Sequence, residues 1–149
     1  MIADLEELPY PTVAAVQGLC IAAGLELALA CDLIWAAASA RFGQAEASIG
    51  TTTLLGGVQR LAERAGPNRA REIIYTADQY DAATFERWNI VNKIVPDETL
   101  ESQTRSFAER LSERAHTRVC GRQEDRPSLP GKRCPRGGPG SRRSGPAAV

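Results

Sequence analysis

The chain has 149 residues, with 18 Lys and Arg against 18 Asp and Glu, and 43% of its residues are hydrophobic. This length allows one domain of ordinary size, and the zero net charge gives no reason to expect nucleic-acid binding by the whole chain. It has no run of 18 apolar residues and no signal-peptide pattern at residues 1–7, so we expect a cytoplasmic protein without a membrane span. Four scattered cysteines without a CxxC motif favour a reduced chain over a disulfide framework.

The balanced charge hides two unlike segments. Residues 1–116 hold 10 Lys and Arg against 16 Asp and Glu, a net charge of −6, whereas residues 117–149 hold 8 against 2, a net charge of +6. The second segment contains 6 Gly and 5 Pro but no Ile, Phe, Trp or Tyr, so it cannot bury enough apolar area to offset its ordering entropy. We predict a folded domain over 1–116 and a basic disordered tail over 117–149.

A basic tail of this kind either binds nucleic acid or acidic membranes or has no specific role. We favour the second interpretation and expect neither a nucleic acid nor a membrane as partner. The mixture of Arg, Pro, Gly and Ser is also typical of an out-of-frame translation of a GC-rich gene, which the coding DNA would test.

The first half of the domain alternates apolar strands with an apolar helix. Residues 12–16 and 33–38 are short buried strands, and residues 42–50 form a loop and a short strand. Residues 19–31, rich in Ala and Leu, form a helix that is apolar on nearly every side and is therefore expected to be buried.

The second half is predicted to be mainly helical, with one strand. Gly66 suits the end of one helix and Pro67 the start of the next. The predicted helices span residues 56–65, 67–76, 81–88 and 98–115, the last one capped by Asp97, and a strand spans residues 90–95. Strands alternating with helices indicate an α/β fold.

Glu26 is the first candidate functional residue, because it lies inside the apolar helix. An ionised carboxylate is expensive to bury without a partner, so Glu26 must be paired, protonated or facing a cavity. These considerations favour two interpretations of Glu26 equally. One is a structural ion pair with Arg41 or Arg60, and the other is a role in a site.

Glu46 is the second candidate, on a loop near the strand ends. By itself it would be read as an exposed loop carboxylate. Two carboxylates, however, can divide acid and base work if their environments differ.

Small residues precede Glu26, namely Ala22, Ala23 and Gly24. Free N–H groups at a helix start can hold an anionic oxygen, and small side chains let a ligand approach that backbone. Close helix packing is the alternative explanation for them.

The remaining chemistry-bearing residues receive structural interpretations. Cys20 and Cys31 are expected in the core, Asp32 at the helix end or in a turn, and His116 has no catalytic role. The sequence contains no metal-ligand cluster, and Gly56-Gly57 reads as a helix start rather than a nucleotide loop.

The motifs together resemble the enoyl-CoA hydratase/isomerase (crotonase) family. They are PTVAAVQG at residues 11–18, AAGLELALACD at 22–32, FGQAE at 42–46 and GGVQRL at 56–61, in the family's order and spacing, with a weaker match at 76–95. The resemblance covers roughly residues 8–115.

The resemblance implies a partial crotonase-like spiral of ββα units and an acyl-CoA thioester substrate, with coenzyme A as part of that substrate and no separate cofactor. The backbone N–H of Ala23, flanked by Ala22 and Gly24, would be one of two donors to the thioester oxygen. Glu26 would help activate the water that attacks the β-carbon, and Glu46 would deliver a proton to the α-carbon. The implied reaction is hydration of a 2-enoyl-CoA, as in fatty acid β-oxidation.

The resemblance leaves alternatives open. Other family members are isomerases, decarboxylases, hydrolases or dehalogenases, although two glutamates favour a hydratase over an isomerase. Ala22-Ala23 stands where many members have Gly-Gly, and family domains carry a further segment before residue 12 that supplies the second N–H donor and much of the CoA adenine pocket. We therefore also expect that the chain resembles a truncated member that is inactive by itself, whereas full-length members form homo-oligomers (trimers or hexamers).

Overall fold

The computed structural model describes residues 2–8 and 10–118. In chain order the elements are α1 (Ile2–Glu6), β1 (Val13–Val16), β2 (Leu19–Ile21), α2 (Ala23–Ala30), β3 (Leu33–Ala37), β4 (Arg41–Gly43), the 3-10 helix η1 (Glu46–Ile49), α3 (Gly57–Ala65), α4 (Pro67–Thr76), β5 (Tyr80–Asp81), α5 (Ala82–Arg87), β6 (Lys93–Val95), the 3-10 helix η2 (Asp97–Thr99) and α6 (Leu100–Arg118). No helix within the described residues is long and apolar enough to cross a membrane.

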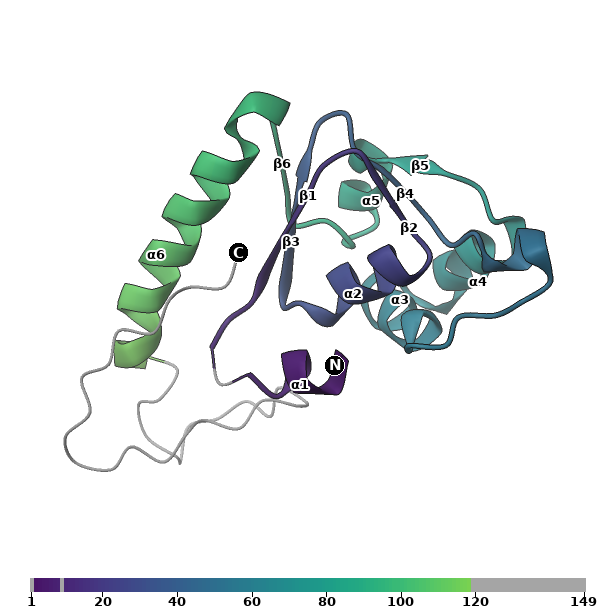
Figure 1. Cartoon of the computed structure of the whole chain (residues 1–149), viewed down its shortest axis with the longest axis horizontal. Coiled ribbons are helices and arrows are strands. Elements are labelled where there is room, and N and C mark those ends of the chain that lie inside the picture. Colours follow the sequence, from purple (N-terminus) through teal and green to yellow (C-terminus); the bar gives the residue numbers. More distant parts are fainter. Residues whose placement is uncertain (1, 9, 119–149) are drawn as a thin grey trace.

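The strands form two three-stranded sheets, in the orders β1-β3-β6 and β2-β4-β5. The first sheet is parallel throughout, and β2 and β4 are also parallel, whereas β4 and β5 are antiparallel. In the first sheet, β1 and β3 are each followed by a strand of the second sheet and then by helix, as in the ββα units that the family resemblance implied. Figure 1 shows α6 along the β1-β3-β6 sheet, with α3 and α4 on the opposite side of the molecule.

The predicted helix over residues 19–31 was wrong at its start. Residues 19–21 form β2, because Gly18 turns the chain with a φ of +67° and Cys20 pairs with Phe42 of β4. A pairing with a strand 20 residues further on leaves no helical signal in the local sequence. The helix proper begins at Ala23 and ends at Ala30.

The expected helices α3 and α4 are present, and Gly66 lies between them with a φ of +82°. The strand predicted over 90–95 is shorter, because β6 begins at Lys93. Asp97 does not cap α6, since its carboxylate accepts hydrogen bonds from the backbone N–H and the hydroxyl of Ser39. Helix α6 continues to Arg118, so residues 117 and 118 of the expected tail are helical, and residues 119–149 lie outside the described part of the chain.

One apolar core joins the two sheets to the helices around them. Its fully buried side chains include Leu25 of α2, Ile34 of β3, Phe42 of β4, Leu61 of α3 and Phe85 of α5. At about 25 cal/mol per Å² of buried apolar area, such side chains contribute most of the free energy that fixes α2 relative to both sheets.

Candidate functional site

Glu26 lies on α2 and its side chain is only 2% exposed. Its Oε1 accepts hydrogen bonds from the backbone N–H of Leu55, at 2.9 Å, and of Gly57, at 2.8 Å. Gly57 is the first residue of α3, where N–H groups lack intrahelical acceptors and the helix dipole is positive. The buried carboxylate is therefore satisfied by the start of a neighbouring helix. Both recorded bonds end on Oε1.

The ion pair with Arg41 or Arg60 does not hold Glu26. Arg41 lies 4.0 Å from Asp81, and Arg60 lies 2.7 Å from Glu6. The hydrogen bond that Arg60 donates to the Glu6 carboxylate raises the pKa of Arg60, and the negative charge of Glu26 adds to that effect. The expected ion pair is thus absent from the recorded contacts of Glu26, and backbone N–H groups hold its carboxylate instead.

Arg64 of α3 holds the opposite end of α2. Its guanidinium donates to the carbonyl oxygens of Leu29 and Cys31, at 3.2 and 2.6 Å, and to that of Ile90 at 3.3 Å. Burial lowers the pKa of Arg64. The last carbonyls of a helix carry partial negative charge, which a cation at this position stabilises. Helices α2 and α3 therefore bind each other reciprocally, through Glu26 in one direction and Arg64 in the other.

The start of α2 is open, contrary to the expectation of a helix buried on all sides. Ala23 and Gly24 are exposed, and Leu27 is 44% exposed. Position 23 is the first of the helix, so its N–H has no intrahelical acceptor, and no atom lies within 4 Å of a side chain added at Gly24. A carbonyl or anionic oxygen has room to approach this backbone.

Ala22, just before the helix, has a φ of 52° and a ψ of −127°. Only glycine adopts this region freely, so an alanine here is strained. The conformation is held on both sides, because the N–H of Ala22 donates to the carbonyl of Gly43 and its carbonyl accepts from the N–H of Glu26. The strained residue orients the peptide that precedes Ala23.

Glu46 opens the 3-10 helix η1 and is half-buried rather than fully exposed. The Gln44 amide is oriented with its nitrogen toward Glu46, because the reverse orientation would place its oxygen against the carboxylate oxygens; the nitrogen then donates to both of them, at 3.1 and 2.8 Å. A Cβ at Gly57 would lie 2.6 Å from the other end of that amide and 3.0 Å from Oε1 of Glu26. The Gln44 amide therefore lies next to both candidate carboxylates, which the structure brings to one region beside α3.

Sequence reasoning missed Gln44 and Arg64 in this region. Gln44 stands two positions before Glu46, and residues so spaced on extended backbone lie on the same side, which is a weak signal. Nothing local marks Arg64, because its acceptors lie between 26 and 35 residues away in the chain.

The residues given structural interpretations behave largely as expected. Cys20 is buried, which raises its pKa to about 11, and Cys31 is half-buried. The carboxylate of Asp32 accepts from the N–H and hydroxyl of Thr12, at 2.6 and 2.8 Å, and so ties the start of β1 to the turn before β3. His116 lies in α6. Within the described residues, no group of His, Cys, Asp and Glu is arranged to hold a metal ion.

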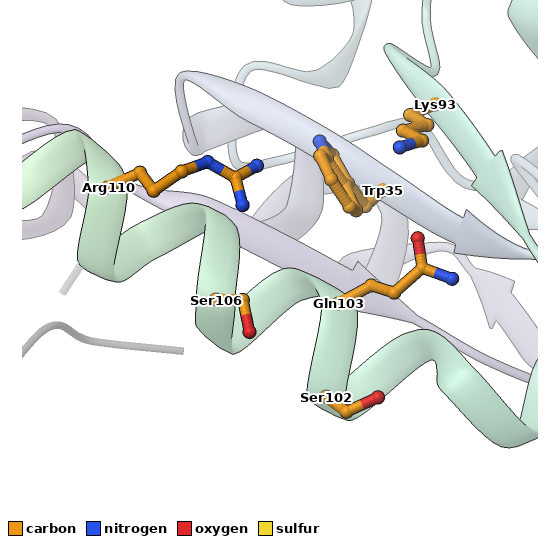
Figure 2. Close-up of a pocket in the computed structure, with 6 residues that line it drawn as sticks. All are labelled: Trp35, Lys93, Ser102, Gln103, Ser106 and Arg110. Atoms are coloured by element: carbon orange, nitrogen blue, oxygen red, sulfur yellow. The ribbon is translucent and has the colours of Figure 1, made fainter.

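A shallow cavity of about 190 Å³ lies elsewhere, between α6 and strands β3 and β6 (Figure 2). Trp35, Lys93 and Arg110 line it, and the Lys93 ammonium lies 4.5 Å from the centre of the Trp35 ring. None of the candidate site residues lines this cavity. The carboxylates and the open helix start therefore define a separate surface.

The geometry is suited to a reaction that moves protons near an anionic oxygen. One carboxylate is fixed by backbone donors, the second is held by an amide, and an open helix start lies on the same helix as the first. Comparison with known proteins bears on this arrangement. The family model described as enoyl-CoA hydratase/isomerase matches residues 1–123. The chain belongs to the enoyl-CoA hydratase/isomerase family.

Relatives in this family share the fold as well as the sequence. The crotonyl-CoA hydratase of Syntrophomonas wolfei is 40% identical over 107 residues, which are 72% of this chain and 41% of the relative. An enoyl-CoA hydratase from Bacillus anthracis superposes with a TM-score of 0.73 at 36% identity, over 74% of this chain and 43% of that structure. A structure from Thermobifida fusca, solved in complex with CoA, gives a TM-score of 0.71 at 32% identity, over 74% of this chain and 42% of that structure. The chain spans about two fifths of the length of these relatives.

Proposed function

We propose that this chain carries the acid–base part of an enoyl-CoA hydratase site, which adds water across the C2–C3 double bond of a 2-enoyl-CoA thioester. The observation that supports this most strongly is the pair of carboxylates, Glu26 and Glu46, around the Gln44 amide and the start of α3. The name of the Syntrophomonas relative and the CoA complex of the Thermobifida relative also support a thioester substrate.

In the proposed reaction the N–H of Ala23 donates to the thioester oxygen, which gains negative charge as C3 is attacked. Ala22 and Gly24 flank this donor and keep bulk away from it. Preorganised backbone donors aimed at developing charge commonly contribute about 100- to 1000-fold in rate each. Ala23 supplies one such donor.

The water molecule gives its hydroxyl to C3 and loses one proton, while C2 gains one proton. Glu26 takes up the water proton through Oε2, since Oε1 is engaged by Leu55 and Gly57. Glu46 starts as the carboxylic acid and delivers its proton to C2. Glu26 then releases the water proton to solvent and Glu46 takes one up from solvent, so no net proton is consumed beyond those of the added water.

Exposed apolar side chains on the same segments suit the acyl group. Ile49 of η1 is 79% exposed, and Leu54, in the loop before α3, is 82% exposed. We propose that they contact the acyl chain. Homo-oligomer formation, as in full-length family members, is part of this proposal, and light scattering on the full chain would test it.

The experiment is incubation of the full chain with crotonyl-CoA, followed by mass-spectrometric detection of 3-hydroxybutyryl-CoA. If the wild-type chain forms product, we expect Glu46→Gln to lose hydration without losing thioester binding. Hydration that survives Glu46→Gln contradicts the assignment. A wild-type chain that forms no product supports the alternative of an inactive fragment, and conversion of 3-butenoyl-CoA to crotonyl-CoA would favour an isomerase.

A further inference from the structure

The Gln44 side chain is a buried amide directly after β4, with only 1% of its surface exposed. A buried amide is unfavourable unless it forms hydrogen bonds. The amide is oriented with its nitrogen toward Glu46, because the reverse orientation would face oxygen against oxygen, and this nitrogen donates to the Glu46 carboxyl group.

The other end of the amide is confined by the start of α3. A Cβ at Gly57 would lie 2.6 Å from it, closer than side-chain carbons approach other atoms. The backbone N–H of Gly57 also donates to Glu26, so Gly57 contacts the Glu26 carboxylate and adjoins the Gln44 amide. The Gln44 amide therefore lies close to both Glu46 and the start of α3.

Glu46 needs such a restraint more than Glu26 does. It lies at the first position of a four-residue 3-10 helix, is half-buried, and the hydrogen bonds recorded for its carboxylate all come from Gln44. A glutamate side chain that is free to rotate samples many rotamers, and only one of them places an oxygen at a given carbon. Effective proton delivery requires that oxygen to be held in place.

We propose that Gln44 is a positioning residue, whose amide holds the Glu46 carboxylate in the orientation needed for proton transfer to the substrate. The proposal rests on the proposed function for its catalytic part, while the Gln44–Glu46 contact can be tested without any activity. Gln44 itself does not act on the substrate in this proposal.

The first experiment compares the full-length wild-type chain with Gln44→Met, a change of similar volume that removes the donor. We expect kcat for crotonyl-CoA hydration to fall roughly 10- to 100-fold, with KM changed less than about threefold. Gln103→Met is the matched control, because the amide of Gln103 in α6 donates to Thr99 at the end of η2, and it should leave kcat unchanged. An unchanged kcat in a folded Gln44→Met chain overturns the proposal.

The second experiment needs no catalysis and separates this proposal from the proposed function. The side-chain amide resonances of Gln44 are followed by ¹⁵N NMR in the wild-type chain and in Glu46→Ala. We expect slow hydrogen exchange of this amide in the wild type, and a clear shift with faster exchange in the variant. If the chain proves inactive but this shift occurs, the positioning contact stands and the hydratase assignment alone fails. Identical Gln44 resonances in both chains overturn the proposal.

Discussion

The two ends of α2 are built in opposite ways, although only eight residues separate them. At the C-terminal end, Arg64 takes up the carbonyls of Leu29 and Cys31, and the surrounding residues are mostly buried. At the N-terminal end, Ala22 is strained, Ala23 has no intrahelical acceptor for its N–H, and Gly24 faces open space. Glu26 lies between them and is fixed by α3.

The difference shows how the fold tolerates a helix start with free N–H groups and a strained residue. Free N–H groups and a strained residue lower stability, so the helix that carries them must be fixed elsewhere. The hydrogen bonds of Arg64 and Glu26 to and from the α3 region supply that restraint. We therefore expect substitutions at the closed end to act mainly on folding, and substitutions at the open end to act mainly on the bound oxygen.

The largest effect is expected at the closed end, with Arg64→Met. This change removes a largely buried cation that donates to the backbone carbonyls of Leu29, Cys31 and Ile90. We expect the free energy of unfolding to fall by about 3 kcal/mol, measured by urea denaturation. Arg105→Met, which loses only an exposed pair with Glu101, should change it by less than about 0.5 kcal/mol. Equal effects of the two variants would contradict the closed-end account.

Gly57→Ala should have the next largest effect, because it tests the junction between the two helices. The new Cβ would be 2.6 Å from the Gln44 amide and 3.0 Å from Oε1 of Glu26, so both side chains must move. We expect a loss of about 2 kcal/mol in the free energy of unfolding. Gly24→Ala, with open space around it, is the matched control and should be neutral or stabilising by up to about 1 kcal/mol.

At the open end, Ala22→Gly should stabilise the protein. Glycine adopts a φ of 52° with a ψ of −127° without strain, so we expect a gain of about 1 kcal/mol, measured as a raised urea midpoint. Ala28→Gly, within the same helix, should instead lose about 1 kcal/mol. Destabilisation by Ala22→Gly would mean that the backbone before Ala23 is not strained.

The smallest effect concerns Asp97, whose bonds to Ser39 lie away from α2 and serve as a reference for both ends. The side-chain and backbone hydrogen bonds of Ser39 lower the pKa of Asp97 below its ordinary value of 3.8. A lowered carboxyl pKa contributes stability at neutral pH, and this contribution is lost as the pH falls below 3.8 through the folded-state pKa. Ser39→Ala should raise the Asp97 pKa in an NMR titration, and the stability difference from wild type should shrink in acid. A difference independent of pH would contradict this.

The parts of the structure that depend on local signals could be predicted from the sequence. Gly66 and Pro67 mark the boundary between α3 and α4 because they act within one turn of their own position. Strand β2 could not be predicted, because its pairing with β4 is distant in sequence and its residues also suit a helix. The sequence shows Ala22 where many family members have Gly, but only the backbone angles reveal the strain.

The candidate site also has features that the sequence predicts and features that only the fold reveals. The buried position of Glu26 follows from the apolar residues beside it, but its partners do not, since a sequence shows side chains and Glu26 is held by backbone N–H groups. The sequence could not show that Glu46 lies near Glu26. Their proximity is seen from the Gln44 amide and Gly57, which lie on segments that only the fold brings together.

The central claim is that the open end of α2 receives a thioester oxygen at the N–H of Ala23. Backbone ¹⁵N NMR of the full chain, titrated with butyryl-CoA, tests it directly, because this saturated thioester cannot be hydrated during the measurement. The account predicts saturable shifts of the Ala23 and Gly24 amides, with those of Cys31 and Asp32 at the closed end unchanged. Shifts confined to the cavity beside α6, or no shift at Ala23 at saturating butyryl-CoA, would contradict it.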